Sequence, residues 1–343
     1  MQLPFSSNIP ISKLASVFRN TSATYKFYWF WAILEIVEEG KSTINKKGVF
    51  ARILSLSWYT VNYFHISFGK QDLIQQAIFK VKEVENLRID DKQGVILNRL
   101  IKSKNPETVK LLHHFDNNVP HKFLSPWLGS GSRAKVYEQS LDRRKNTPYQ
   151  LHKEHIVIND RWFEYFRNNV GILKSFCFWN LALFLQSRNP NVPDIPNKIH
   201  RPIIRGSLNK HKQKFWDIVI NELGFVNCIY TNEKLVVGDY IVEHFLPHQF
   251  VAHDLMWNLI PADSQFNSKK SDKLPPYEKY FDDFYYLQKE GFEIIKKKSP
   301  KNKFLQDYLT IFPELYFDRS RFVEHIQPML TIAHNNGFQY LKT

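Results

Sequence analysis

Cysteine is scarce in this chain, with Cys177 and Cys228 as the two thiols among 343 residues. Two thiols cannot form a framework of several disulfides, and they cannot supply the four cysteine ligands of a structural zinc site. The scarcity of cysteine therefore predicts a reducing compartment.

Long hydrophobic runs are also missing. The apolar runs end after about 10 or 11 residues, which is half of what a helix needs to span a bilayer. The first residues, MQLPFSSNIPISKL, have no basic segment followed by an apolar one, as a secretory signal would. These two features predict a cytoplasmic protein that does not contact a membrane.

Glycine and proline are few, at 12 and 17 residues, whereas aromatic residues reach 15% and hydrophobic residues 43%. This composition argues against low-complexity and mainly disordered chains, because it supplies enough apolar surface for a sizeable core. The length allows two or three domains. We therefore expect a protein that is folded over nearly its whole length.

Acidic residues are outnumbered, since 33 Asp and Glu stand against 47 Lys and Arg and leave a formal charge of +14 at pH 7. A basic surface raises the local concentration of polyanions, so nucleic acid is the first class of partner to consider. Many basic proteins bind no nucleic acid, and the charge therefore needs a second signal beside it.

Helical patterns dominate the first third of the chain. Apolar stretches without Gly or Pro predict helices over residues 24–38, 49–64, 70–85 and 92–102, with Gly40 closing the first. The aromatic residues at helical spacing in them are interpreted as core, with a base-stacking surface as the alternative: Trp29, Trp31, Trp58 and Tyr59. Residues 1–118 are therefore predicted to form a helical N-terminal domain.

Residues 119–214 are predicted as a middle region of irregular and helical segments, with a proline-rich linker at 188–206. The sequence GSGSR at 129–133 is interpreted as a flexible turn, because no GK[ST] follows to make it a phosphate-binding loop. Residues 120–159 are expected to be irregular, and a helical pattern returns over 160–187. The region thus connects two more ordered parts of the chain.

The next segment alternates apolar residues around a turn. FVNCIYTNEKLVVGDYIVEHF predicts a β-hairpin whose turn is TNEK, and FWDIVINELG before it predicts a helix that ends at Gly224. Beyond residue 276 the pattern is helical again, so residues 281–343 are predicted to be a C-terminal helical cover.

Polar residues with catalytic potential gather in IVEHFLPHQFVAHDLMWNLIPADSQFNSKKSDKLP, residues 241–275. Glu243 and His244 stand side by side at the end of the predicted strand, Asn258 follows in WNL, and Asn267 follows in FNSKKSD. This order and spacing resemble the HNH motif of the ββα-metal nucleases, including the HNH module of RNA-guided CRISPR effector nucleases. The resemblance implies a ββα-metal module at residues 215–280.

The resemblance implies a chemical role for each motif residue. An imidazole titrates near neutral pH, so His244 is expected to be the general base that deprotonates water, lining a solvent-filled cleft. A divalent cation, Mg²⁺ or Mn²⁺, is expected between Glu243 and Asn267, because hard oxygen ligands suit it and it offsets charge on the phosphate. Asn258 is expected to fix the loop by hydrogen bonds to backbone, and Asn267 to open a short helix that carries the metal.

Basic residues beside the motif are expected to contact nucleic acid: Lys269, Lys270, Lys273 and His248. Each residue also has an ordinary alternative, since a single histidine is usually structural and a lysine run is usually a solvated face. The joint spacing of the motif favours the functional interpretation. We expect His253 to be structural or DNA-facing and not catalytic.

Two departures from the family's pattern bear on activity. Glu243 occupies a position where Asp is usual, and its longer side chain moves the carboxylate by roughly 1 Å, a misplacement that can cost about 100-fold in rate. Cys228 stands alone where many relatives carry CxxC pairs around the hairpin, so packing must hold the hairpin.

Segments outside the motif, such as SATYKFYWFWAILEIV, FLSPW and RNPNVPDIPNK, resemble bacterial HNH-domain proteins with a helical N-terminal region. That resemblance implies a bacterial defence or restriction system and possible partner subunits. The fold class we expect is α+β and mostly helical, and the function is metal-dependent DNA cleavage. The alternatives are a DNA-binding or assembly subunit impaired by the Glu243 change, and an RNA-cleaving nuclease.

Overall fold

The structure is a computed structural model that describes residues 2–200 and 206–342, and within helix α15 (Ser264–Lys270) it leaves aside the side chains of residues 267 and 268. The fold is α+β and mostly helical, as the sequence predicts. Its described residues divide into two compact units, an N-terminal unit of residues 2–190 and 195–200 and a C-terminal unit of 191–194 and 206–342. The division falls within the segment predicted as a linker, and each unit is described by itself.

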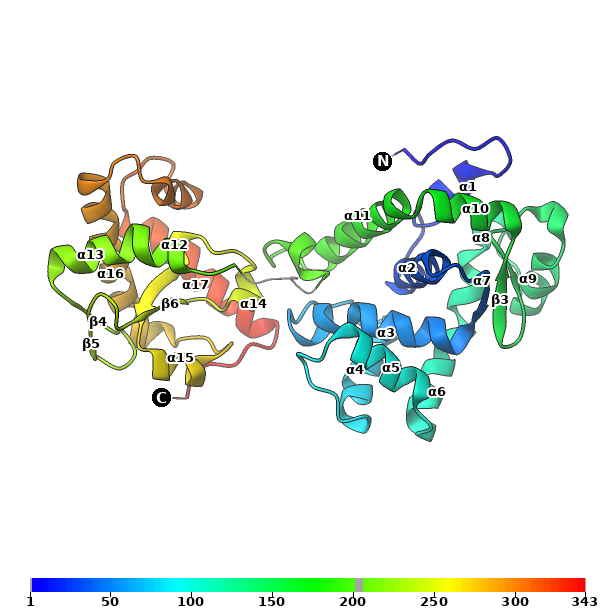
Figure 1. Cartoon of the computed structure of the whole chain (residues 1–343), viewed down its shortest axis with the longest axis horizontal. Coiled ribbons are helices and arrows are strands. Elements are labelled where there is room, and N and C mark those ends of the chain that lie inside the picture. Colours follow the sequence, from blue (N-terminus) through cyan, green and yellow to red (C-terminus); the bar gives the residue numbers. More distant parts are fainter. Residues whose placement is uncertain (1, 201–205, 343) are drawn as a thin grey trace. The chain divides into compact units, whose positions relative to one another are not determined.

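The N-terminal unit is built around helix α2 (Tyr25–Glu38), which packs against α3 (Lys46–Asn62), α10 (Asp160–Asn168) and α11 (Val170–Arg188) (Figure 1). Helix α2 is buried on nearly every side, which explains its unbroken apolar sequence. The remaining helices are α1 (Ile11–Ala15), α4 (Leu73–Val84), α5 (Gln93–Lys102), α6 (Pro106–His114), α7 (Val119–Phe123), α8 (Ser125–Leu128) and α9 (Arg133–Ser140). Short 3₁₀ turns are η1 (Phe115–Asn117), η2 (Arg143–Lys145) and η3 (Ile195–Lys198).

The aromatic residues of these helices lie in the core. Trp29 and Trp58 are fully buried, while Trp31 and Tyr59 expose 6% and 5% of their surface. The indole N–H of Trp29 donates a hydrogen bond to the Tyr149 hydroxyl at 3.0 Å. These positions confirm the core interpretation, and such buried rings cannot serve as a base-stacking surface.

Residues 120–159 are more regular than expected. They contain α7, α8 and α9 and the strands β2 (Tyr149–Leu151) and β3 (His155–Ile158), which form a three-stranded sheet with β1 (Thr43–Asn45) in the order β1-β3-β2. Both pairings are antiparallel. These elements are only three to eight residues long, too short to leave a clear periodicity in the sequence.

Helix α11 differs from the expectation of short apolar runs. With 19 residues, it is long and apolar enough by length and composition to cross a membrane, although one such helix is weak evidence for a span. One face packs on α2, where the Cys177 thiol contacts the Phe27 carbonyl at 3.0 Å. The opposite face exposes about half of the surface of Ile172, Trp179 and Leu183.

The C-terminal unit surrounds two small antiparallel sheets with helices. Strands β4 (Val226–Asn227) and β5 (Lys234–Leu235) pair around the predicted turn, and β6 (Ile241–His244) pairs with β7 (Leu259–Ala262). The helices are α12 (Asn209–His211), α13 (Asp217–Leu223), α14 (His248–Val251), α15 (Ser264–Lys270), α16 (Tyr277–Lys298) and α17 (Arg319–Asn335). A π-helical turn η4 (Lys212–Trp216) and 3₁₀ turns η5 (Met256–Asn258) and η6 (Lys303–Thr310) complete this unit.

The predicted hairpin needs one correction. Its turn TNEK does join two paired strands, but the second strand breaks after Leu235, and Gly238 takes a φ of +96° before the chain resumes as β6. Strand β6 then pairs with β7 and not with the first strand of the hairpin. A glycine in this left-handed region accounts for the break, because residues with a Cβ rarely adopt it.

Candidate active site

The pairing of β6 with β7 positions the two central motif residues. Glu243 lies opposite Ile260 and His244 lies opposite Leu259, and β6 ends at His244. Because successive side chains on a strand point to opposite faces, Glu243 and His244 leave the strand in different directions. His244 is buried and exposes 1% of its surface, whereas the Glu243 side chain exposes 12%.

Asn258 fixes the chain that leaves β6. Its side-chain oxygen accepts a hydrogen bond from the Leu246 N–H at 2.8 Å, and its amide nitrogen donates to the Leu246 carbonyl at 2.9 Å. The Phe245 N–H donates to the Asn258 carbonyl at 2.8 Å. Asn258 is fully buried. Its two side-chain bonds to Leu246 connect the two chain segments just beyond the last residues that β6 and β7 pair. The loop backbone just after His244 is thereby held.

The His244 imidazole meets a carboxylate that the sequence motif does not include. Its Nε2 lies 2.9 Å from Oδ1 of Asp254, and His248 Nε2 lies 3.9 Å from the same oxygen. Partial burial favours a raised pKa for Asp254, but the hydrogen bond from His244 and the charges of nearby histidines outweigh it and hold the pKa below its usual range. Asp254 is therefore ionised at neutral pH and accepts a hydrogen bond from the imidazole N–H.

His211 also belongs to this group. Its pKa is lowered by burial, and the negative charge of Asp254 opposes that shift. Sequence reasoning missed both Asp254 and His211. Asp254 could have been found as a carboxylate in the loop between two paired strands, ten positions after His244; His211 offers no signal, because it lies far upstream in a basic run.

Glu243 contacts a lysine that was expected elsewhere. The ammonium of Lys270 donates to Glu243 Oε1 at 3.1 Å and to the His244 carbonyl at 2.8 Å, and the Lys270 side chain is fully buried. Lys270 was predicted to hold phosphates on the surface; a buried ammonium that neutralises Glu243 is not available for that role. Its contacts place helix α15 against strand β6.

Asn267 belongs to helix α15, but its side chain lies outside what the structure describes. The helix begins at Ser264, three residues before Asn267, and the Asp263 carboxylate accepts from the N–H groups of Gln265 and Phe266. Asn267 is thus inside the helix and does not open it, contrary to the prediction. Asp263 takes the capping role because its carboxylate suits the free N–H groups of a first turn.

A divalent cation fits the kind of donor present here. Among the described residues, no three His, Cys, Asp or Glu side chains gather as a metal cluster. Mg²⁺ commonly uses one or two protein oxygen ligands and completes its shell with water and phosphate, so a full cluster is not required. The Glu243 carboxylate is one such hard ligand, and helix α15, which carries Asn267, packs beside it.

The other predicted residues divide by exposure. Lys269 and Lys273 are exposed near the end of α15, and the Lys273 ammonium donates to the Lys269 carbonyl at 3.2 Å. The His248 side chain exposes 10% and is directed toward Asp254, and the His253 ring lies 5.3 Å from that of Trp257.

The buried position of His244 also corrects the expectation that it lines an open, solvent-filled cleft.

The comparisons with known proteins agree with this geometry. Residues 228–276 match the family model described as HNH endonuclease. The match covers β5, β6, β7 and α15, so the C-terminal unit contains an HNH-family domain. Members of this family are in general nucleases that use a divalent metal and act on nucleic acid. No curated protein matches the chain, and no solved structure matches it either.

Proposed function

We propose that this protein is a metal-dependent endonuclease that hydrolyses DNA phosphodiester bonds, with His244 as the general base. The observation that carries the proposal is the hydrogen bond between His244 and Asp254 at the end of β6, inside the segment that matches the HNH family. A histidine oriented by a carboxylate is an arrangement suited to proton abstraction.

The carboxylate determines which imidazole nitrogen can act as the base. Because Asp254 is ionised and accepts only, Nε2 of His244 must carry the proton in their hydrogen bond. The lone pair is then on Nδ1, which takes the proton from the attacking water. Asn258 holds the loop that leaves β6, so the imidazole keeps its orientation through the reaction.

Glu243 and Asn267 are the residues we assign to a divalent cation, Mg²⁺ or Mn²⁺. Such a cation supplies charge neutralisation at the scissile phosphate and the leaving O3′. Lys270 supports this role of Glu243 from the protein side, because its buried ammonium holds one carboxylate oxygen in place and leaves the other for a ligand.

The substrate class follows from charge. The chain carries a formal +14, and Lys269 at the end of helix α15 and Lys273 just after it are exposed, where they can hold phosphates of the DNA backbone. The resemblance of the N-terminal segments supports a cytoplasmic bacterial defence or restriction system, with possible partner subunits, as the setting of this activity.

The test is cleavage by the full chain of supercoiled plasmid and of single-stranded RNA of similar length, in Mg²⁺, in Mn²⁺ and in EDTA. We expect nicking of the plasmid in at least one metal and none in EDTA. Cleavage of RNA alone would replace the DNA assignment, and cleavage that persists in EDTA would remove the metal from the mechanism.

A further inference from the structure

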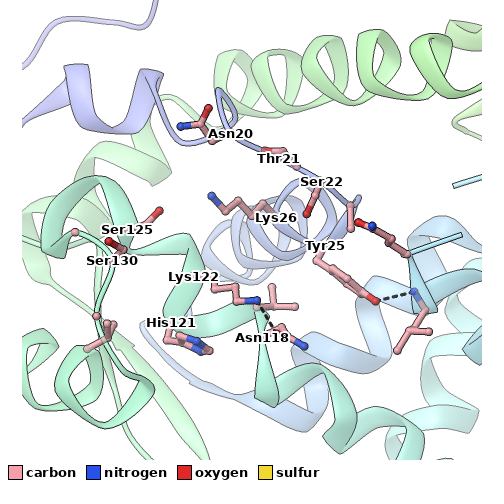
Figure 2. Close-up of a pocket in the computed structure, with 17 residues that line it drawn as sticks. Asn20, Thr21, Ser22, Tyr25, Lys26, Asn118, His121, Lys122, Ser125 and Ser130 are labelled. Carbon is pink, nitrogen blue, oxygen red and sulfur yellow. Dashed lines mark hydrogen bonds between the residues drawn. The ribbon is translucent and has the colours of Figure 1, made fainter. Parts of the chain in front are cut away.

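The N-terminal unit contains a cavity of about 460 Å³, within the range of roughly 300–1,000 Å³ typical of small-molecule sites. It lies between the start of helix α2, the loop before it, helix α7 and the GSGS loop that precedes α9 (Figure 2). The HNH domain contributes none of the lining residues. The cavity is therefore separate from the candidate active site, and the proposed nuclease activity does not account for it.

Two lysines face this cavity without a carboxylate beside them. Lys26 on α2 and Lys122 on α7 are among the lining residues, and no Asp or Glu is among those that the structure describes there. Lys26 donates to the Val17 carbonyl at 3.3 Å, and Lys122 donates to the Asn118 side-chain oxygen at 2.7 Å. Neither contact neutralises an ammonium. Burial and then the charge of Lys122 lower the pKa of Lys26, as expected when like charges lie close together.

Hydroxyl and amide groups surround the two ammonium groups. Figure 2 shows the Lys26 ammonium directed into the space between Asn20 and Ser125, with Ser130 beyond it and Lys122 below. Thr21 and Ser22 complete this rim from the loop before α2. Two cations and several neutral donors around one cavity are the groups that bind a phosphate.

The glycine-rich loop that the sequence presents as a simple turn forms one wall. Gly129 has φ +74° and ψ −171°, a backbone conformation that residues with a Cβ rarely adopt. Ser132 then caps helix α9 by accepting from the Lys135 N–H. The loop thus holds Ser130 and Gly131 at the cavity in a shape that depends on glycine.

The remaining wall is apolar. Ala23, Leu73 and Val119 line it, together with the Tyr25 side chain, whose hydroxyl accepts a hydrogen bond from the Leu73 N–H at 2.6 Å; Val136 lies beside Gly131 at the other end. That bond fixes the ring at the end of the cavity opposite to Ser130 in Figure 2. A ligand with an anionic part and a flat or apolar part would match the two ends.

We propose that this cavity binds a small phosphate-bearing ligand of nucleotide size, with Lys26 and Lys122 on the phosphate and the Tyr25 side on the base or other apolar part. The site is separate from the HNH domain, and the inference does not depend on nuclease activity. The N-terminal unit would thus bind a small molecule through its own residues.

The test is isothermal titration calorimetry of the full chain in EDTA at constant ionic strength, with inorganic phosphate, adenosine monophosphate, adenosine and a short DNA oligonucleotide as probes. We expect the monophosphate to bind at least tenfold more tightly than adenosine, and phosphate to compete with it. Lys26→Met and Lys122→Met should each weaken binding of the monophosphate roughly tenfold, because each removes a charged hydrogen-bond donor. Lys110→Met, an exposed lysine on α6 away from the cavity, should leave it unchanged.

Because Lys26 is partly buried, its variant is first checked by thermal melting; Lys122 is exposed, so its variant carries the test if Lys26→Met does not fold. The proposal is overturned if neither phosphate nor the monophosphate binds at millimolar concentration, or if Lys122→Met binds as tightly as the wild type. Binding of an oligonucleotide alone, without competition by phosphate, would likewise overturn it in favour of a polymer surface.

Discussion

At the scale of single residues, the proposed mechanism rests on the contact between His244 and Asp254. Its ionised carboxylate selects the imidazole tautomer, and both side chains belong to one short loop-and-strand segment. The proposed general base is thus oriented by a group that was absent from the predicted motif.

Replacing Asp254 with Asn tests that role. The amide can offer its N–H to Nε2, which would move the imidazole proton to Nδ1, the nitrogen to which the proposal assigns proton abstraction. We expect Asp254→Asn to lower kcat for plasmid nicking by roughly 100-fold or more with little change in KM. Asp239→Asn, an exposed carboxylate before β6, is the matched control. A wild-type rate for Asp254→Asn would show that His244 needs no such partner.

Glu243 provides the second test at this scale. If it is a metal ligand, Glu243→Ala should abolish cleavage, whereas Glu243→Asp should retain or increase it because the shorter carboxylate matches the family's usual residue. Mg²⁺ demands closer octahedral geometry than Mn²⁺, so Asp should also shift the preference toward Mg²⁺. The measurement is plasmid nicking by the wild type and both variants in each metal.

The outcomes of that experiment separate two interpretations. Cleavage by Glu243→Ala at the wild-type rate would exclude Glu243 as a ligand. A wild type that is inert in both metals, revived by Glu243→Asp alone, would favour an impaired DNA-binding or assembly subunit. Lys270 bonds to the Glu243 carboxylate, so each variant also needs a melting curve, because Glu243→Ala removes the counter-charge of a buried ammonium.

At the scale of elements, the ladder between β6 and β7 and its extension by Asn258 hold the site. Asn258 is fully buried and both of its side-chain bonds go to Leu246. Asn258→Ala would leave the Leu246 N–H and carbonyl without partners, at about 1–3 kcal/mol for each buried group. We expect a loss of roughly 2–4 kcal/mol in the free energy of unfolding, measured with urea, and a fall in cleavage.

Asn227→Ala on β4 is a suitable control, because Asn227 is exposed and should change stability by less than about 0.5 kcal/mol. Equal stability of Asn258→Ala and the wild type would mean that the loop does not depend on this side chain.

Sequence patterns predicted the long helices and missed the short elements of residues 120–159, for a physical reason. Helices α2, α3, α4 and α5 lie within three residues of their predicted bounds at each end, because each has several turns of apolar periodicity. Strands β2 and β3 and helix α9 have three to eight residues, and their positions depend on contacts distant in sequence. The motif residues were visible by spacing, whereas Asp254 and the burial of Lys270 follow from tertiary packing.

At the scale of the whole molecule, one buried and two partly buried histidines are expected to make stability depend on pH. Burial lowers the pKa of His121, His211 and His325 below the ordinary value of 6.5, so the unfolded chain binds protons that the folded protein does not. Stability is then lost as pH falls below 6.5. We expect the free energy of unfolding by urea to drop by roughly 1–2 kcal/mol from pH 7 to pH 5.5.

The variant His325→Phe tests whether His325 contributes to this pH dependence. The Phe ring can keep the contact with Trp257, but it has no titrating nitrogen. The fall in stability over the same pH range should be shallower in this variant. A stability that is flat or rises from pH 7 to pH 5.5 would contradict the account.

Catalysis by His244 is the central claim, and plasmid nicking by His244→Ala beside the wild type tests it most directly. We predict a loss of about 10²- to 10⁴-fold in the metal that supports cleavage, because a general base contributes on that order. Circular dichroism and melting curves should show a folded variant, and His113→Ala, an exposed histidine on α6, should cut at the wild-type rate. A folded His244→Ala that nicks plasmid as fast as the wild type would contradict the proposed mechanism.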